Sequence, residues 1–269
     1  MLVFLLLSHL SLSGAVQSGI FGGGEAKPHS RPYMASLQIG RSHSCGGVLI
    51  REDFVLTAAH CLNPSVRLDS VVLGAHNIGK KEKSQQRIGI SEFIPHPNYP
   101  KKKLSDDDPR AFHHDIMLLK LQTKAKLKKK KVEVLQLPDK VGEKIPAGVQ
   151  CEVAGWGRRC FGKPAESVLY EAKVKLEQPA KCENKWEEYY DQAQMTCSVS
   201  DGKEGFCQGD SGGPLICGKG KAKILYGLTA YNEEPCDTTD KPEVYMKVPH
   251  YLPWIKNVLS ANDALQTKT

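Results

Sequence analysis

The sequence predicts an all-β protein that ends in one α-helix. Short apolar or alternating runs, separated by Gly, Pro, Asn and Asp, are typical of barrels and sandwiches. The nine cysteines are typical of a disulfide-linked protein from an oxidising compartment. Only residues 251–259 repeat apolar side chains at three- and four-residue steps, which predicts the helix. The predicted strands are 34–39, 47–50, 54–57, 116–121, 149–153, 169–176, 224–228 and 244–248.

The length of 269 residues allows one large domain or two small ones. Hydrophobic residues make up 40% and charged residues 25%, which excludes a disordered or fibrous protein. A segment rich in Pro and Gly between residues 137 and 148 predicts a linker between two halves.

Residues 1–19 form a separate segment with no Asp, Glu, Lys or Arg. Their apolar run ends near Leu12 and is shorter than the roughly 20 residues that cross a bilayer. Ser13, Gly14 and Ala15 follow it as a small-residue cleavage site. A buried N-terminal helix is the alternative, but the segment caps poorly. We interpret residues 1–19 as a signal peptide plus a short activation peptide, and expect no membrane span.

The odd number of cysteines leaves at least one of the nine without an intrachain partner. No Cys-x-x-Cys pair occurs, which argues against a zinc ribbon or a thioredoxin-like redox site. Spacing alone leaves the connectivity open.

Three motifs carry candidate chemistry: TAAHC at 57–61, DIMLL at 115–119 and GDSGGP at 209–214. Each residue alone has a purely structural interpretation: His60 can be a structural histidine, Asp115 a cap and Ser211 part of a tight turn. Together they supply a hydroxyl nucleophile, an imidazole base and a carboxylate that orients the base. The chain order His, Asp, Ser is one of the known arrangements of such a triad.

These motifs, with IFGG at 20–23 and GWG at 155–157, give the chain its resemblance to trypsin/chymotrypsin-fold serine proteases from residue 20 to about 259. Residues 28–35, PHSRPYMA, further resemble the leukocyte granule branch of granzymes, mast-cell proteases and cathepsin G. The resemblance implies two six-stranded antiparallel β-barrels, at 20–137 and 138–269, the second carrying the C-terminal α-helix.

The resemblance implies that Ser211 is the nucleophile, His60 the general base and then acid, and Asp115 its orienting group. The oxyanion hole is then formed by the amides of Gly209 and Ser211.

The resemblance also implies that a freed amine at Ile20 pairs with the carboxylate of Asp210, which it places in the interior beside the nucleophile, and that this pairing orders the oxyanion loop. Gly19 precedes Ile20, so tryptic activation is not expected. Signal cleavage after Ala15 leaves two dipeptides, Val16-Gln17 and Ser18-Gly19, for a dipeptidyl peptidase to remove.

The resemblance also implies four disulfides and leaves Cys160 over, as a free buried thiol or as half of an intermolecular bridge. The implied pairs are Cys45–Cys61, Cys151–Cys217, Cys182–Cys197 and Cys207–Cys236.

The implied substrate pocket has a Gly where trypsin-like members carry an Asp. That position is Gly205, so ordinary tryptic specificity is not expected. Glu243 stands where many relatives carry Gly, and its carboxylate can pair with a basic side chain, with tolerance for bulky aromatics as in cathepsin G. The alternative is that Glu243 turns to solvent and leaves an apolar pocket, since an unpaired buried charge is costly. The implied pocket residues are Gly205, Phe206, Gln208, Ala230, Tyr231, Asn232 and Glu243.

We predict no bound metal and no cofactor. In the loop that often binds calcium in trypsin-like relatives, Ala75 and Gln85 replace acidic ligands and only Glu82 remains.

Lysine clusters at 80–81, 101–103 and 128–131 contribute to a net charge of +7. They form either a solvated face or a site for sulfated proteoglycan. No aromatics interleave with them, so specific nucleic-acid binding is not expected.

The sequence therefore predicts a serine endopeptidase that is secreted or stored in a cytolytic or secretory granule. The resemblance implies cleavage after Lys, Arg or bulky aromatic residues and a role in immune defence. It also implies that the partners are protein substrates and macromolecular protease inhibitors. The alternative is a non-catalytic cationic binding protein on the same scaffold, but every motif residue needed for catalysis is present.

Overall fold

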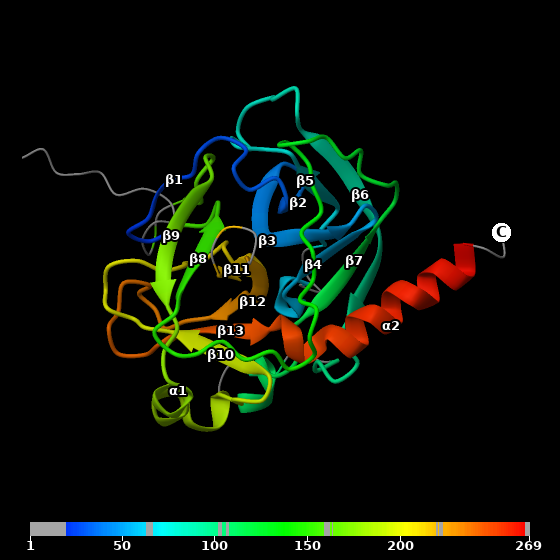
Figure 1. Cartoon of the computed structure of the whole chain (residues 1–269). Helices are drawn as coiled ribbons and strands as arrows, with labels where there is room; N and C mark the ends of the chain where they lie inside the picture. Colours follow the sequence, from blue (N-terminus) through cyan, green and yellow to red (C-terminus); the bar gives the residue numbers. More distant parts are fainter. Residues whose placement is uncertain are drawn as a thin grey trace, which may run out of the picture.

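A computed structural model describes residues 20–62, 67–101, 104–105, 108–158, 162, 164–218, 220 and 223–266. The expected signal and activation peptides at 1–19, Cys160 and Lys102–Lys103 lie outside these residues. The all-β prediction is confirmed, and the strands form two packed units (Figure 1).

The first unit is a closed antiparallel barrel with the strand order β2-β3-β4-β7-β6-β5, as expected. Its interior holds Leu37, Leu49, Val55, Val71 and Leu119, all buried because alternate side chains of each strand point inward. Short 3₁₀ turns, η1 (Ala59–Cys61) and η2 (Pro109–Phe112), leave it toward the second unit. Its strands are β2 (Met34–Ile39), β3 (Ser42–Arg51), β4 (Phe54–Thr57), β5 (Ser70–Leu73), β6 (Gln86–Pro95) and β7 (Met117–Leu121).

The second unit is a seven-stranded antiparallel sheet with the order β1-β9-β8-β11-β12-β13-β10. Six of these strands match the expected second barrel, and the two-residue β1 at the start of the chain adds the seventh. A single bridge between Leu176 and Ser198 joins the β9 and β10 ends of the curved sheet. Its strands are β1 (Gly24–Glu25), β8 (Gln150–Gly155), β9 (Tyr170–Lys175), β10 (Met195–Ser198), β11 (Pro214–Cys217), β12 (Ile224–Tyr231) and β13 (Glu243–Lys247).

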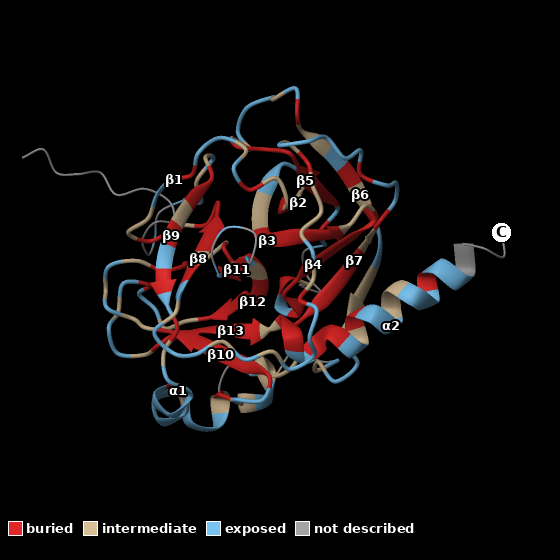
Figure 2. Cartoon of the chain, viewed as in Figure 1, coloured by how far each residue is buried: buried red, intermediate tan, exposed pale blue. Residues whose placement is uncertain are grey.

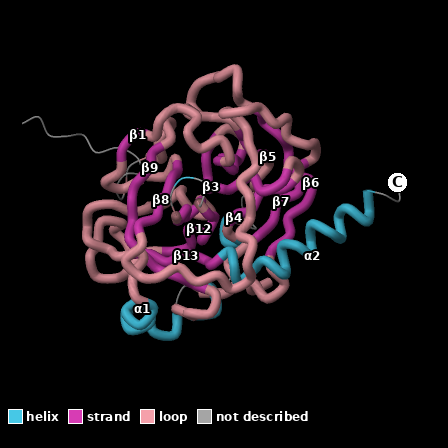
Figure 3. Tube along the Cα trace, in the orientation of Figure 1, coloured by secondary structure: helices cyan, strands magenta, loops and turns pink. Residues whose placement is uncertain are grey.

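Helices lie at the periphery of the strands (Figure 3). The C-terminal helix α2 (Val248–Gln266) is longer than the predicted 251–259, because Arg51 holds its last turns through Leu259 O at 3.2 Å and Asp263 at 2.7 Å. Its outer turns are mostly exposed (Figure 2). Helix α1 (Pro179–Trp186) and η3 (Glu187–Tyr189) were not predicted. Among the described residues, no helix combines the length and apolar character needed to cross a membrane.

One hydrophobic core joins the two units. Phe54 and Leu118 of the barrel, Leu228 and Val244 of the second sheet, and Ile255 of α2 belong to the same buried cluster. The backbone of β3 also meets the second unit directly, where Gly46 N donates to Ser211 O at 2.8 Å. Residues that lie at this junction are therefore held by both halves.

Candidate active site

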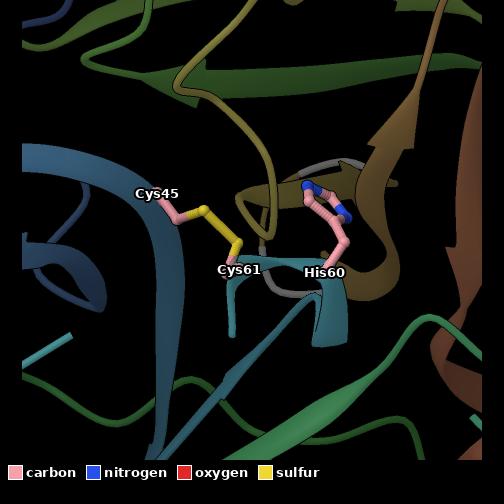
Figure 4. A group of neighbouring side chains, drawn as sticks. All are labelled: Cys45, His60 and Cys61. Carbon is pink, nitrogen blue, oxygen red and sulfur yellow. A yellow bond between two sulfur atoms is a disulfide. The ribbon is translucent and has the colours of Figure 1, made fainter. Parts of the chain in front are cut away.

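His60 sits at the junction because β4 ends in the 3₁₀ turn η1. The next residue, Cys61, is joined by a disulfide to Cys45 of β3, which fixes the turn against the barrel (Figure 4). One ligand atom from each of Cys45, His60 and Cys61 lies within 4.8 Å of the others, a spacing that would suit a metal ion. Because both sulfurs are consumed by the disulfide, no thiolate is available to bind one.

Asp115 precedes β7 and is 3% exposed. Its Oδ2 lies 2.6 Å from His60 Nδ1, and its Oδ1 accepts the His60 amide at 2.7 Å. The carboxylate therefore holds a proton on Nδ1 and leaves Nε2 as the basic nitrogen. Loss of water around the ring lowers the pKa of His60, but the charge and hydrogen bond of Asp115 together outweigh this, so that the pKa is raised above 6.5.

Ser211 lies in the turn between residues 207 and 213, whose backbone meets Cys61, the residue after His60. Its carbonyl oxygen lies 3.8 Å from Cys61 Sγ and accepts from Gly46 N, which places it across the junction from His60. Within the described chain, Ser211 Oγ makes no hydrogen bond. The structure thus joins Asp115 to His60 directly and leaves the neighbouring hydroxyl open.

The turn around Ser211 exposes two amide donors. The amides of Asp210, Gly212 and Gly213 donate to Cys207 O, Thr229 O and Asp210 O at 3.0, 2.8 and 2.9 Å. Over the described residues, the amides of Gly209 and Ser211 have no such acceptor. Gly209 has φ +96° and Gly212 φ +75°, and a Cβ at Gly212 would collide with Thr57 Oγ1, so the turn requires glycine. Two free amides on one turn suit a developing oxyanion.

Asp210 is fully buried behind this turn. Its Oδ1 accepts from Gly157 N at 2.8 Å and its Oδ2 from Cys207 N at 3.0 Å. Burial raises the pKa of Asp210 to about 7, although these two amides oppose the shift. Ile20 is likewise fully buried, but no ion pair to Asp210 occurs among the described residues.

The sequence-predicted pocket residues gather on the second sheet and the segment before Ser211. Asn232 Nδ2 donates to Phe206 O at 2.9 Å, and Gln208 Nε2 donates to Glu234 Oε1. The Phe206 ring turns into the core against Tyr245, with ring centroids 5.2 Å apart, so Phe206 contributes backbone rather than side chain. Ala230 and Tyr231 are buried at the end of β12.

Glu243 does not turn toward solvent: it is 3% exposed. Oε1 accepts from Phe206 N at 2.8 Å, and Oε2 accepts from Tyr245 Oη at 2.9 Å and from Ser198 Oγ at 3.1 Å. A Cβ at Gly205 would overlap Oε1, so the carboxyl occupies the space that glycine leaves. Burial raises the pKa of Glu243 to about 8, and the three donors only partly offset it.

Sequence reasoning missed several residues that shape the site. Ser198 and Tyr245 hold Glu243, and Phe112, Trp186 and Tyr189 surround Tyr231. It also missed His43, whose Nε2 lies 2.9 Å from Gly209 O. Ser198, Tyr245 and His43 lie in strands and Phe112, Trp186 and Tyr189 in short helices, and none of them belongs to a local sequence motif that could mark it.

The loop that follows β5 uses its oxygen atoms internally. Glu82 accepts the amides of His76 and Asn77 at 2.8 and 3.0 Å. Gln85 Nε2 donates to the carbonyls of Asn77 and Lys80 at 2.9 and 3.0 Å. Protein N–H groups thus bind the oxygens that a calcium ion would require, so this donor set does not suit the ion.

Comparison with known proteins gives consistent matches. The family described as Trypsin matches residues 20–255. Granzyme B of Rattus norvegicus is 42% identical, covering 96% of this chain and 99% of its own length, and Duodenase-1 of Bos taurus is 40% identical, covering 96% of each. Chymase of Papio hamadryas is 41% identical, covering 94% of this chain and 96% of its own. The solved structure of neuropsin, a serine protease expressed in the limbic system of mouse brain, has a TM-score of 0.77 at 36% identity, covering 89% of this chain and 100% of that one.

Proposed function

This chain belongs to the trypsin family of serine proteases, and from that premise we propose that it is an active endopeptidase that works through an acyl-enzyme on Ser211. The observation that carries the proposal is the Asp115–His60 pair, with 2.6 Å between Oδ2 and Nδ1, beside an unbonded Ser211 hydroxyl. Its similarity to granzymes and chymases supports the same reaction class.

The proposed chemistry begins when His60 Nε2 takes the Ser211 proton as Oγ attacks the substrate carbonyl carbon. The carbonyl oxygen becomes an oxyanion bound by the amides of Gly209 and Ser211. His60 then gives its proton to the leaving amine, the C–N bond breaks, and an ester remains on Ser211. A water repeats the sequence and releases the acid.

Labelling with a fluorophosphonate tests the reaction class. Protein matured to begin at Ile20 should be labelled at Ser211 and should cleave a peptide library, whereas the Ser211→Ala protein should do neither. A matured wild-type protein that resists the probe and cleaves no peptide would refute the proposal and favour a binding protein on this scaffold.

For substrate choice, we propose cleavage after Lys or Arg, with bulky aromatics accepted. Glu243 beside Gly205 offers a carboxylate to a basic side chain, and its raised pKa of about 8 leaves a neutral, less polar group below that pH. Positional scanning of cleavage sites checks this preference. Cleavage confined to acidic residues would exclude it.

Maturation supplies the missing partner of Asp210. An amine freed at Ile20 would neutralise a buried carboxylate that only backbone amides now contact. We infer that removal of residues 16–19 as two dipeptides, after signal cleavage, completes the enzyme. N-terminal sequencing of the active form should begin at Ile20, and any other start would contradict this route.

We further propose that the protein is secreted or stored in a granule, with a role in immune defence, and that it meets sulfated proteoglycan there. Gln86 bonds both the amide and the carbonyl of Lys126, at 2.8 and 2.7 Å, and Gly74 lies against both Ser84 and Val132, so the loop before β6 runs near the 124–131 segment. We call the resulting surface the lysine face; its members are Lys80, Lys81, Lys83, Lys126, Lys128, Lys129, Lys130 and Lys131.

Elution from a heparin column tests the lysine face. Replacing Lys128–Lys131 with Gln should lower the salt needed for elution, because exposed charges act through screened attraction. Replacing Lys140, Lys144, Lys173 and Lys175 with Gln removes the same charge elsewhere. Equal shifts in the two variants would show that net charge alone is responsible.

A further inference from the structure

An unbroken line of hydrogen bonds runs from the surface of the first barrel to the turn that carries Ser211. Arg87 Nη2 of β6 donates to Gln38 Oε1 at 2.5 Å, and Gln38 Nε2 donates to Ser36 Oγ at 3.0 Å. Ser36 Oγ lies 2.8 Å from His43 Nδ1, and His43 Nε2 lies 2.9 Å from Gly209 O. Ser36 and Gln38 are at most 1% exposed, so water does not replace these contacts.

The chemistry at the two ends fixes the direction of every bond in this line. A carbonyl oxygen only accepts, so His43 must carry its proton on Nε2. Burial lowers the pKa of His43 to about 4, so the ring is neutral and its Nδ1 is an acceptor. Ser36 must therefore donate its hydroxyl proton to Nδ1. At the other end Arg87 only donates, so Gln38 presents its oxygen to Arg87 and its amide to Ser36.

Arg87 is itself fixed, although it is exposed. Its Nη1 donates to Ser70 Oγ at 2.6 Å and to Gly40 O at 2.9 Å. Asp69 accepts from Ser70 Oγ at 2.6 Å and from the Gly40 amide. The line therefore starts from a charge tied to β5 and to the hairpin between β2 and β3.

The line ends on Gly209 O, in the peptide that follows the candidate oxyanion donor, the Gly209 amide. The peptide before Gly209 is held from the other side, because Arg158 N donates to Gln208 O at 2.7 Å. Gly209 lies between these two bonds at φ +96°. With both flanking carbonyls held, the Gly209 amide keeps one direction and stays free of internal acceptors.

We propose that Gln38 and Arg87 are positioning residues for the oxyanion site. They hold Ser36 as a donor and His43 in the Nε2–H form, and His43 in turn fixes the Gly209 carbonyl, on the C-terminal side of the oxyanion donor. The inference rests on the proposed function, since it assigns a role in the same reaction. Neither residue touches the reacting atoms.

Replacing Gln38 with Glu should reverse the direction of the hydrogen bonds from Ser36 to His43 without removing them. The introduced carboxylate still accepts from Arg87 but cannot donate to Ser36, so the Ser36 hydroxyl turns to the carboxylate. His43 must then carry its proton on Nδ1, and its bare Nε2 faces the Gly209 carbonyl. Loss of one oxyanion donor costs about 10²–10³ in kcat, and a misdirected donor should cost about tenfold or more.

The test compares matured wild type, Gln38→Glu, Arg87→Gln and the control Gln86→Glu. Gln86 precedes Arg87 in β6 and also makes paired hydrogen bonds, but to the backbone of Lys126. We expect Gln38→Glu to lower kcat about tenfold with KM within about twofold, and Arg87→Gln to lower kcat by a smaller factor. Gln86→Glu should match wild type.

A nitrogen-15 NMR spectrum of the histidine rings separates positioning from stability. The His43 signals, assigned against His43→Asn, should change from the Nε2–H to the Nδ1–H pattern in Gln38→Glu, and a purely structural role would move the melting temperature but not this pattern. Unchanged kcat in folded Gln38→Glu and Arg87→Gln, beside an active wild type, would overturn the inference alone. An inactive, unlabelled wild type would instead overturn the proposed function. If Gln38→Glu fails to fold, the kcat of the Arg87→Gln variant, whose substitution is at an exposed residue, tests the inference.

Discussion

Asp115 makes two short contacts to a single residue, one to the His60 ring and one to the His60 amide. The ring contact selects the tautomer, and the amide contact fixes the turn that carries the ring. A carboxylate is needed for both, because each of its oxygens accepts a proton donated by His60.

Asp115→Asn should therefore lower kcat by about 10⁴ while the fold persists, because an amide allows the wrong His60 tautomer. Steady-state kinetics measure the loss, and circular dichroism verifies the fold. Asp191→Asn, a carboxyl that caps Ala193 at 2.8 Å outside the site, should retain activity. A loss smaller than tenfold in Asp115→Asn would contradict the assigned role.

At Glu243, the raised pKa predicts a pH-dependent substrate preference. The carboxyl gains charge as pH rises through about 8, whereas a substrate Lys stays protonated. The ratio of kcat/KM for Lys over Phe substrates should increase by about tenfold between roughly pH 6.5 and 8.5. Using a ratio cancels the titration of His60, which affects both substrates.

Glu243→Gln should make this ratio independent of pH and shift it toward Phe. Glu233→Gln, an acid near the pocket entrance, should keep the wild-type profile. A flat ratio in the wild type would show that Glu243 does not face the substrate side chain.

At the scale of the elements, Glu82 holds the loop of residues 74–85 through hydrogen bonds to its backbone, in place of an ion. In Glu82→Gln, the NH₂ group of the new side chain would face a backbone amide donor. The substitution should lower the free energy of unfolding by about 1–3 kcal/mol. That corresponds to a fall of about 3–8 °C in Tm, measured by calorimetry. Glu92→Gln on exposed β6 should have little effect.

Chelation is the complementary measurement on the same loop. Adding EDTA should leave the Tm of the wild type unchanged, because Glu82 and Gln85 already satisfy the loop's own polar groups. A calcium-dependent Tm would show that the loop rearranges to bind the ion.

Strands with clear apolar patterns could mostly be predicted from the sequence, but several other strands were missed. β2, β4 and β7 show clear apolar patterns and were placed within a residue. β5 and β10 were missed, since Ser70, Thr196 and Ser198 interrupt their patterns yet are buried, and β1, β6 and β11 were missed as well. In β2 itself, alternation predicts that Ser36 and Gln38 face solvent, whereas both are buried and hydrogen-bonded to each other.

The residues of the candidate site could likewise be predicted only in part. Motifs predicted His60, Asp115 and Ser211 as site residues, and the structure brings two of them, His60 and Asp115, into contact. The positions of Glu243 and Gly205 followed from the family resemblance, but the inward direction of Glu243 depended on Ser198 and Tyr245, which lie on β10 and β13. Contacts between residues this far apart in sequence leave no local pattern.

Across the whole molecule, Arg31 ties the N-terminal segment to the second sheet. Its side chain is 8% exposed and reaches Glu152 at 3.0 Å and Glu171 at 2.8 Å, on β8 and β9. Both glutamates keep some contact with water, which weakens the pairs relative to a fully buried site.

Arg31→Met should cost about 3 kcal/mol, at the lower end for breaking a buried pair, and lower the Tm by about 6–10 °C. Arg110→Met removes an exposed pair with Asp108 and should leave the Tm essentially unchanged. Equal Tm values for the two variants would mean that Arg31 does not stabilise the attachment of the N-terminal segment to the second sheet.

The junction of the two units has a consequence for biosynthesis. The imidazole and its carboxylate emerge from the ribosome long before the serine, on a barrel that closes using its own strands. The serine is made later, in the turn that precedes β11 of the second sheet. A nascent chain that ends before Ser211 therefore carries His60 and Asp115 without the hydroxyl of the proposed triad, and it cannot form the proposed acyl-enzyme.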